Sequence, residues 1–321
     1  MRLCRYRHNN QVELGFYDEQ RILPIAAVAR AYENATHDRL SIPAGDNLLE
    51  LLPGGAANDA ARKLLAFTTQ TGNNLPADIA LETSNVKLLV PIPRPNKLFL
   101  LAGNYNEHIK EGGGKETERA ETFPYVFMKP STTTLTDPNQ PVVVPSSSPN
   151  HIDWELELAV VIGKKCKHVS EADALKYVAG YTVINDISDR KFRPNPGRKQ
   201  REKDTFFDWL HGKWHDSFCP CGPCITSADV IPNPQNLEMK LWLNGKIRQD
   251  ATTGQQIFPV AAVIAFISNI CTLEPGDIIS TGTPAGVGNA TGTYIKAGDT
   301  LEAWIASIGK LVSPVVAEKV A

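Results

Sequence analysis

The sequence lacks an excess of charge of either sign and has no long apolar run. Its 33 lysines and arginines nearly balance 35 aspartates and glutamates, and a net charge of −2 argues against nucleic acid or an anionic membrane as a partner. The longest apolar stretch of helical character, Val260 to Ile267, is far too short to span a bilayer. Met1–Tyr6 opens in strand-like sequence without the apolar segment of a signal peptide, so we expect a cytoplasmic protein.

Cysteine is also sparse. Six cysteines in 321 residues do not make a disulfide framework. Three of them lie in Cys219–Cys224, and with His211 and His215 nearby this segment suggests a zinc site. Its prolines restrict the loop, however, and no second Cys-x-x-Cys pair exists. We therefore expect buried, reduced thiols.

The composition that remains, 42% hydrophobic and 21% charged, is that of a globular protein. Residues 1–90 are predicted to form a small α/β domain for packing or dimer contact. Its expected strands are Met1–Tyr6, Val12–Tyr17 and Arg21–Ile25, and its expected helices are Ile25–Tyr32 and Ala56–Phe67. The stiff segment Pro91–Pro95 marks the start of a second domain, residues 91–321.

The second domain is rich in predicted strands. Helices are expected at Glu171–Val178, with Ser170 as its N-cap, and at Pro259–Ile270. We expect a mixed, mainly β domain of curled sheets, so the fold class of the whole chain is α+β.

The most informative segment is Asp153–Gly163. A strand alternates its faces with period two, so Glu155 and Glu157 point to the same side. The apolar run Leu158–Ile162 is typical of a strand buried on both faces. Two buried like charges repel and lose hydration, and a hard cation such as Mg²⁺, Mn²⁺ or Ca²⁺ removes that conflict. The alternative is an amphipathic strand with its acidic face in water.

Two further residues favour the metal interpretation. Asp186 ends another apolar run of β character and can supply a third carboxylate. Lys213 can offset the surplus negative charge that three carboxylates leave on a divalent ion. Three protein ligands also leave positions open for water or a chelating substrate.

His108 and Glu111 lie three residues apart and would share one face of a helical turn. A carboxylate beside an imidazole fixes its tautomer and raises its basicity, which makes a general-base dyad. A solvent-exposed turn with incidental charges is the alternative. The glycine-rich segment 111–121 suits a lid over the site, or equally a plain mobile loop.

Downstream, Asp277–Gly288 is predicted to be a strand that enters a glycine-rich turn. It matches neither a Walker loop nor a dinucleotide-binding fingerprint, which argues against nucleotide binding. The backbone amides of such a turn, around Gly282, can hold a small carboxylate, and Thr283 adds a hydroxyl. A plain tight turn is the alternative.

Taken together, these segments resemble the fumarylacetoacetate hydrolase superfamily. The matching stretches occur in the family's order and cover roughly residues 91–318: Pro91–Lys97, Asn104–His108, Phe127–Pro130, Trp154–Glu157, Gly180–Thr182, Asn185–Asp186, Gly212–Lys213, Gly222–Pro223 and Thr281–Gly288. Each stretch is weak alone, and the specificity comes from nine of them in order.

The resemblance implies a β-roll fold and a set of site residues. The metal ligands would be Glu155, Glu157 and Asp186, the base dyad His108 and Glu111, and the electrostatic partner Lys213. The substrate would contact Lys129, Arg190, Arg193, Gly282 and Thr283. The expected cofactor is Mg²⁺, or alternatively Mn²⁺ or Ca²⁺, the expected ligand is a small 2-oxo acid, and the expected assembly is a homodimer.

One segment departs from the family pattern. After the ligand aspartate the family usually has Ser-Ala-Arg-Asp, then a glutamine two residues further on. Here Asp189 replaces the alanine, Lys191 replaces the aspartate, and Arg193 stands where the glutamine would be. That glutamine is thought to stabilise an oxyanion in the hydrolases. A guanidinium would either do the same or clamp a second substrate carboxylate, unless it points into the basic surface loop 190–203.

The family's common step forms or releases an enolate beside a 2-oxo acid, with a metal to neutralise the charge. If His108 activates water, a C–C bond of a 2,4-dioxo acid such as an acylpyruvate is hydrolysed, and this is the predicted function. If His108 removes a carbon-bound proton, the outcome is isomerisation, dehydration of a sugar acid, or decarboxylation. A 2-hydroxymuconate-type diacid or oxaloacetate would then be the substrate, which Arg193 would favour. A catalytically inactive binding protein would lack a ligand or dyad residue, and none is missing.

Overall fold

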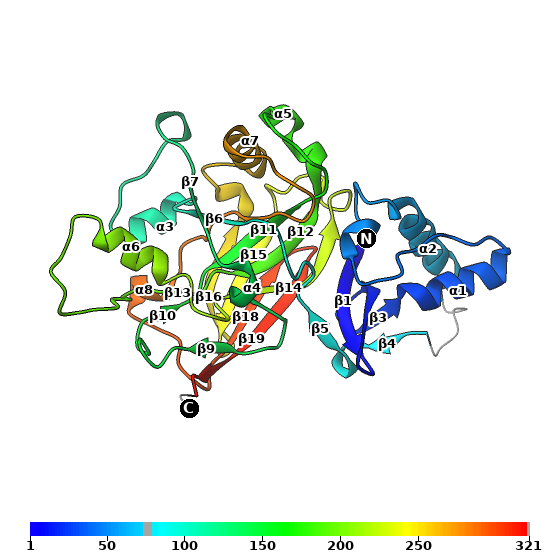
Figure 1. Cartoon of the computed structure of the whole chain (residues 1–321), viewed down its shortest axis with the longest axis horizontal. Coiled ribbons are helices and arrows are strands. Elements are labelled where there is room, and N and C mark those ends of the chain that lie inside the picture. The colour runs from blue at the N-terminus through cyan, green and yellow to red at the C-terminus, as the bar shows by residue number, and fades with distance from the viewer. Residues whose placement is uncertain (73–78, 320–321) are drawn as a thin grey trace.

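Strands dominate the structure, a computed structural model that describes residues 1–72 and 79–319 (Figure 1). The strands are β1 Arg2–His8, β2 Gln11–Tyr17, β3 Arg21–Pro24, β4 Leu81–Glu82, β5 Lys87–Leu89, β6 Leu98–Ala102, β7 Tyr125–Met128, β8 Leu135–Thr136, β9 Val142–Val144, β10 Ile152–Asp153, β11 Leu156–Ile162, β12 Val178–Asn185, β13 Ser188–Asp189, β14 Cys219–Ser227, β15 Glu238–Leu243, β16 Lys246–Thr252, β17 Ile278–Ser280, β18 Thr300–Ile305 and β19 Gly309–Ala317. The helices are α1 Ile25–Thr36, α2 Asn58–Thr71, α3 Asn106–Glu111, α4 Ser131–Thr134, α5 Glu171–Ala174, α6 Asp204–His211, α7 Val260–Ile270 and α8 Gly288–Thr291. The α+β, mainly β fold class is confirmed.

Two large sheets build the molecule. A 12-stranded sheet has the order β4-β3-β2-β1-β14-β12-β11-β17-β6-β7, with β5 paired to β1 and β8 to β14. A five-stranded sheet has the order β16-β15-β18-β19-β9. The N-terminal strands belong to the larger sheet, because β1 pairs antiparallel with β14 at Leu3 and Ile225. The division into domains at residue 90 stays a prediction.

The N-terminal elements form where the sequence predicts them. β1 and β2 make a hairpin, and its two turn residues, Asn9 and Asn10, have φ angles of 48° and 63°. Asparagine tolerates this left-handed conformation, which a two-residue turn between antiparallel strands requires. β3 and the helices α1 and α2 follow, with bounds close to those expected.

Strand β11 is buried along its whole length, as its apolar sequence predicts. Leu158 and Val160 belong to one hydrophobic cluster, which also includes side chains of the five-stranded sheet. Ala159 and Val161 belong to a second cluster on the opposite face, with side chains of β1, β14 and α2. Because Glu157 and Ala159 are two residues apart on the strand, the side chain of Glu157 points to the same face of β11 as this second cluster.

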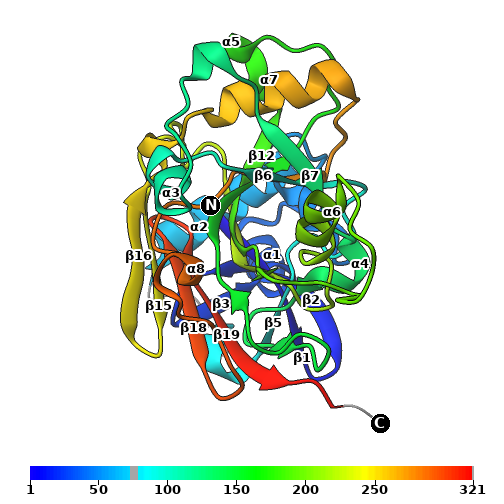
Figure 2. The same ribbon diagram turned by 90° about the vertical axis from the view of Figure 1, so that its left-hand side faces the viewer.

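Two helices differ from expectation. The helix predicted at Glu171–Val178 is α5 followed by a 3₁₀ turn, and Val178 already begins β12; its N-cap Ser170 accepts a hydrogen bond from Asp173 N at 3.2 Å. Helix α6 was not predicted; it directly follows the basic run 190–203. It lies beside the end of β7, as Figure 2 shows. Within residues 1–72 and 79–319, no helix combines the length and apolar character that a membrane span needs.

Candidate active site

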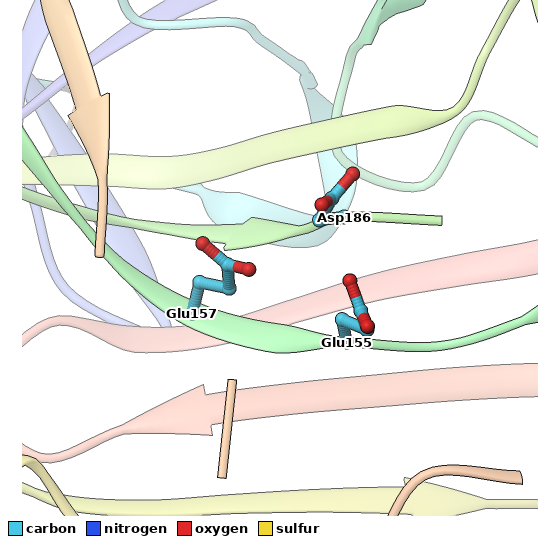
Figure 3. Close-up of side chains that lie close together, drawn as sticks. All are labelled: Glu155, Glu157 and Asp186. Carbon is cyan, nitrogen blue, oxygen red and sulfur yellow. The ribbon is translucent and has the colours of Figure 1, made fainter. Parts of the chain in front are cut away.

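Three carboxylates meet where β11 begins and β12 ends. Ligand atoms of Glu155, Glu157 and Asp186 all lie within 4.8 Å of one another, and all three residues are buried. Figure 3 shows Glu155 and Glu157 leaving the same face of β11 towards Asp186. The two glutamates therefore point to the same side, as the period of two predicts. The antiparallel pairing of β11 with β12 brings the third carboxylate, Asp186, to them.

Cations hold two of the three carboxylates in place. Glu155 accepts from Arg190 Nη2 at 2.7 Å through Oε1 and from Lys213 Nζ at 2.5 Å through Oε2. Lys213 Nζ also donates to Asp186 Oδ2 at 2.7 Å, and Lys129 donates to Asp186 Oδ1. Burial opposes the ionisation of Glu155, but Arg190 and Lys213 outweigh it, so the pKa of Glu155 lies well below its usual value.

Glu157 is held differently. Its Oε2 accepts from Gly282 N at 2.8 Å, whereas its Oε1 is buried without a hydrogen-bond partner among the described residues. Burial, together with the charges of Asp186 and Glu155, raises the pKa of Glu157 well above its usual value. A buried carboxylate oxygen without a partner, facing two other carboxylates, is the environment that a hard divalent cation relieves. The residues present therefore fit a divalent metal.

The charges around the triad do not balance. Four carboxylates, the triad and Asp153, meet three cations, Lys129, Lys213 and Arg190. With all groups ionised, the cluster has one negative charge in surplus. A dication would reverse that sign and make the site attractive to an anion.

The proposed base dyad lies beside this cluster. His108 Nδ1 is 2.8 Å from Glu111 Oε1, and Glu111 Oε2 accepts from Gly286 N at 2.8 Å. The carboxylate holds the proton on Nδ1, which leaves the lone pair on Nε2. His108 Nε2 lies 3.9 Å from Glu155 Oε1, so the basic nitrogen faces the triad.

Two buried amides that the sequence analysis missed connect these parts. Asn104 donates to Thr281 O at 2.8 Å and accepts from Phe258 N at 2.8 Å, just before the helix that carries His108. Gln249 accepts from Leu156 N at 3.0 Å and donates to Thr283 Oγ1 at 2.8 Å, so it ties the start of β11 to the glycine-rich turn. Both are polar side chains in apolar surroundings, and the matching stretch Asn104–His108 was the only sequence signal for either.

Asp153 was missed as well. Its Oδ2 accepts from Arg190 Nε at 2.8 Å, and its carboxylate also accepts from Gly288 N and Asn289 N, at 2.6 and 3.0 Å. Asp153 therefore fixes Arg190, which in turn holds Glu155. Its place directly before Trp154-Glu155 was a signal that could have identified it.

Four of the five predicted substrate contacts lie at the centre, but their polar atoms bind the protein itself. Gly282 N donates to Glu157, Arg190 to Asp153 and Glu155, Thr283 Oγ1 to Leu156 O at 2.9 Å, and Lys129 Nζ to Ile187 O at 2.9 Å and Phe218 O at 2.6 Å. In this arrangement they position the carboxylates and the turn. Their roles towards a substrate stay predictions.

The fifth, Arg193, is not brought to the triad. It is exposed on the loop after Arg190, and no ion pair of Arg193 occurs in the described part of the chain. The neighbouring departure, Asp189, is buried: its Oδ1 accepts from Lys191 N at 3.2 Å, and its Oδ2 lies 3.6 Å from His215 Nε2.

The segment predicted as a lid is tethered at several points. Thr117 N donates to Asn106 Oδ1 at 2.9 Å, Glu116 pairs with Lys110, and Arg119 pairs with Glu171 at the start of α5. The loop therefore lies against the base helix α3 and α5. Its closure over a substrate stays a prediction.

The cysteines of Cys219–Cys224 are buried in β14, as expected for structural thiols. Burial raises the pKa of Cys224 to about 11, so this thiol stays protonated at neutral pH.

Comparison with known proteins agrees with this geometry. Residues 97–316 match the family model "Fumarylacetoacetate (FAA) hydrolase C-terminal". A mitochondrial oxaloacetate tautomerase of Xenopus laevis is 39% identical over 238 residues, 74% of this chain and 70% of that protein. A 2,4-didehydro-3-deoxy-L-rhamnonate hydrolase of Sphingomonas sp. (strain SKA58) is 39% identical over 236 residues, 73% of this chain and 78% of that protein.

A solved structure is similar over almost the whole chain. Maleylpyruvate hydrolase from Sphingobium sp. SYK-6, in complex with manganese(II) and pyruvate, superposes with a TM-score of 0.72 at 30% identity, over 99% of this chain and 100% of that one. The family model matches well over half of the sequence, and the acidic triad lies inside the match. The protein is an enzyme, and it belongs to the fumarylacetoacetate hydrolase family.

Proposed function

We propose that the enzyme is a tautomerase, which interconverts the keto and enol forms of a 2-oxo diacid such as oxaloacetate. The reaction moves one proton between the carbon beside the 2-oxo group and the oxygen of that group. It therefore needs a positioned base and a site that tolerates negative charge on the substrate, and both are properties of the His108–triad arrangement.

His108 is the proposed base. Its Nε2 takes the carbon-bound proton, and Glu111 on Nδ1 stabilises the imidazolium that results. Gly286 N fixes Glu111, so the ring keeps its orientation when the proton is returned to the substrate oxygen. Glu155, Glu157 and Asp186 would hold the divalent ion, which supplies positive charge beside the substrate's oxygens when it is bound.

The observation that carries the choice of reaction is the position of Arg193. Hydrolysis also needs a group that stabilises the oxyanion formed when water attacks the carbonyl. Arg193, at the position of the glutamine in the hydrolases, is exposed on a surface loop. Transfer of a carbon-bound proton involves no attack by water on a carbonyl, so it needs no such group. The similarity to an oxaloacetate tautomerase supports the same choice.

The test follows the tautomerisation directly. Purified enzyme with Mg²⁺ or Mn²⁺ is mixed with enol oxaloacetate, and the ultraviolet absorbance of the enol is followed over time. We expect a faster approach to an unchanged equilibrium, and loss of the acceleration in His108→Asn. An approach to equilibrium that is equally fast with wild type and His108→Asn would contradict the proposal.

Hydrolysis of a C–C bond in a 2,4-dioxo acid is the second candidate. It is supported by the similarity to the rhamnonate hydrolase and to the maleylpyruvate hydrolase. In this reaction His108 would activate water instead of removing a carbon-bound proton. Release of pyruvate from an acylpyruvate, with a kcat/KM above that of tautomerisation, would favour it.

Three finer expectations accompany the proposal. Magnesium as the metal, a cytoplasmic location and a homodimer remain predictions. The mitochondrial tautomerase of Xenopus laevis gives a specific alternative for the location.

A further inference from the structure

A carboxylate and an imidazole nitrogen face each other in the interior, outside the acidic triad. Asp189 is buried, and its Oδ2 lies 3.6 Å from His215 Nε2. Both atoms are buried, and neither has a hydrogen-bond partner among residues 1–72 and 79–319. Buried polar atoms are nearly always paired, so these two require a physical explanation. Neither residue takes part in the proton transfer described above.

The two atoms are suited to pair with each other. A separation of 3.6 Å is too long for a hydrogen bond, but a movement of about 0.5 Å brings it into the N–H···O range. The other oxygen of Asp189 accepts from Lys191 N at 3.2 Å, which leaves Oδ2 for the imidazole. The imidazole itself packs against two rings, Phe192 and Phe218, with centroids 5.1 and 4.9 Å from its own. An imidazole with its proton on Nε2 is therefore placed to donate to Oδ2.

The segment that carries His215 also carries Lys213. Residues 212–218 connect α6 to β14, so Lys213 lies on a turn and not on a strand of the sheet. Its Nζ nevertheless donates to both Glu155 and Asp186, at 2.5 and 2.7 Å. A lysine side chain is long and flexible, so its ammonium keeps such a position only when the backbone that carries it is held.

Strand β13 holds this backbone from one side. Asp189 N donates to Gly212 O at 2.9 Å. A Cβ atom on Gly212 would lie 2.5 Å from Asp189 O, so only glycine allows the two backbones to approach this closely. The pairing of Asp189 with His215 adds a second link, three residues further along the turn. The two links therefore lie on either side of Lys213 in the sequence.

We propose that Asp189 and His215 are positioning residues for Lys213. A hydrogen bond from His215 Nε2 to Asp189 Oδ2 holds residues 212–215 against β13. The ammonium of Lys213 then stays in contact with both carboxylates that it bridges, and these keep their places in the triad. The inference deepens the proposed function and rests on it only for the effect on turnover.

Chemical labelling of the lysines in the full chain tests the proposal without metal or substrate. An amine-reactive acetylating reagent is added, and the labelling rate of each lysine is measured by peptide mass spectrometry. Asp189→Ala should label Lys213 at least about tenfold faster than wild type, because the turn loses a hydrogen bond to a charged group. An unchanged rate at Lys213 would overturn the proposal.

Lys129 is the internal control of the labelling experiment. It is buried and holds the same Asp186, but it lies after β7, away from the turn 212–218. Its rate in Asp189→Ala should change less than about twofold, because its backbone is held by other contacts. Equal acceleration of Lys129 and Lys213 would show a general loosening of the fold and would overturn the positioning role.

Two substitutions of His215 separate the hydrogen bond from the packing of the ring. His215→Gln keeps an N–H donor but loses the contacts with Phe192 and Phe218, and Lys213 labelling should stay within about threefold of wild type. His215→Phe keeps a ring but has no donor, and labelling should rise about as much as in Asp189→Ala. The opposite order would assign His215 to packing alone.

Turnover connects the pair to the proposed function. With enol oxaloacetate, Asp189→Ala and His215→Phe should each lower kcat about tenfold, and the double variant should lose no more than the weaker single variant, because the same bond is lost in each. Additive losses, or unchanged kcat in both single variants, would overturn the proposal. A wild type without tautomerase activity would refute the proposed function instead, and the labelling rates would still decide on the pair.

Discussion

The strand-borne part of the site, on and beside β11 and β12, differs sharply from the loop-borne part, on the loop 190–203. Glu155, Glu157 and Asp186 lie on or directly beside β11 and β12, are buried, and have all but one carboxylate oxygen bonded to the protein. The loop 190–203 begins four residues after Asp186, yet Arg193 on it is exposed. Proximity in sequence to the three carboxylates therefore does not place a residue at the centre.

The difference between the two parts has a structural cause. A carboxylate on a buried strand has its position fixed by the sheet hydrogen bonds and by the cations around it. A side chain on a solvated loop has no such constraint and is free to change between relatives. The strand-borne part thus has the fixed geometry that a metal site needs, and the loop-borne part does not.

The largest effect is expected for the strand-borne part. Glu157→Ala should abolish tight Mn²⁺ binding in a calorimetric titration, because the one buried carboxylate oxygen without a protein partner is removed. Glu202→Ala, at an exposed carboxylate of the loop, is the control and should bind as wild type does. Unchanged Mn²⁺ affinity in Glu157→Ala would contradict a metal-binding role for Glu157.

The second-largest effect is expected for the proposed base, His108. His108→Asn is expected to lower kcat by about 10²–10⁴, the usual contribution of a positioned general base. Mn²⁺ affinity should stay as in wild type, since His108 Nε2 is 3.9 Å from Glu155 and is not a predicted ligand. His168→Asn, at a surface imidazole beside Asn269, is the matched control. Full turnover in His108→Asn would exclude the proposed role.

A smaller effect is expected for Glu111. Glu111→Gln keeps the shape of the side chain but loses the charge that holds the imidazole, and kcat should fall roughly 10–100-fold. The loss should be in kcat with KM nearly constant, as measured with the enol oxaloacetate assay. A loss confined to KM would assign Glu111 to substrate binding instead.

The smallest effect is expected for the loop. Arg193→Gln should change kcat/KM less than about threefold for both diacid and monoacid substrates, because the side chain is exposed and pairs with no described residue. A loss of ~1.5–3 kcal/mol for diacids only would instead show that the loop brings a charge-assisted clamp to the substrate. Comparing the two substrate types decides between these roles.

Local sequence patterns predicted the parts of the molecule that depend on period and turn chemistry. The alternation around Glu155 and Glu157 placed both on one face, and the strand-like stretches Met1–Tyr6 and Val12–Tyr17 predicted β1 and β2. These features require only neighbours in sequence, so a single chain reveals them.

The parts that depend on distant partners were missed. Helix α6 directly follows the basic run 190–203, and its Trp209 packs on Phe127 of β7, with ring centroids 5.1 Å apart. The bond from Gly286 N to Glu111 joins residues 175 positions apart. Neither is encoded in a local pattern, because each needs the assembled sheet to bring its partner near.

The central claim is that Glu155, Glu157 and Asp186 hold one divalent metal. The most direct measurement is an anomalous difference map from a crystal of the full chain soaked in Mn²⁺, recorded at a wavelength where manganese scatters anomalously. The account predicts one strong peak within coordination distance, about 2.0–2.6 Å, of an oxygen from each of the three carboxylates. A map without a peak there, or with its strongest peak at other residues, would contradict it.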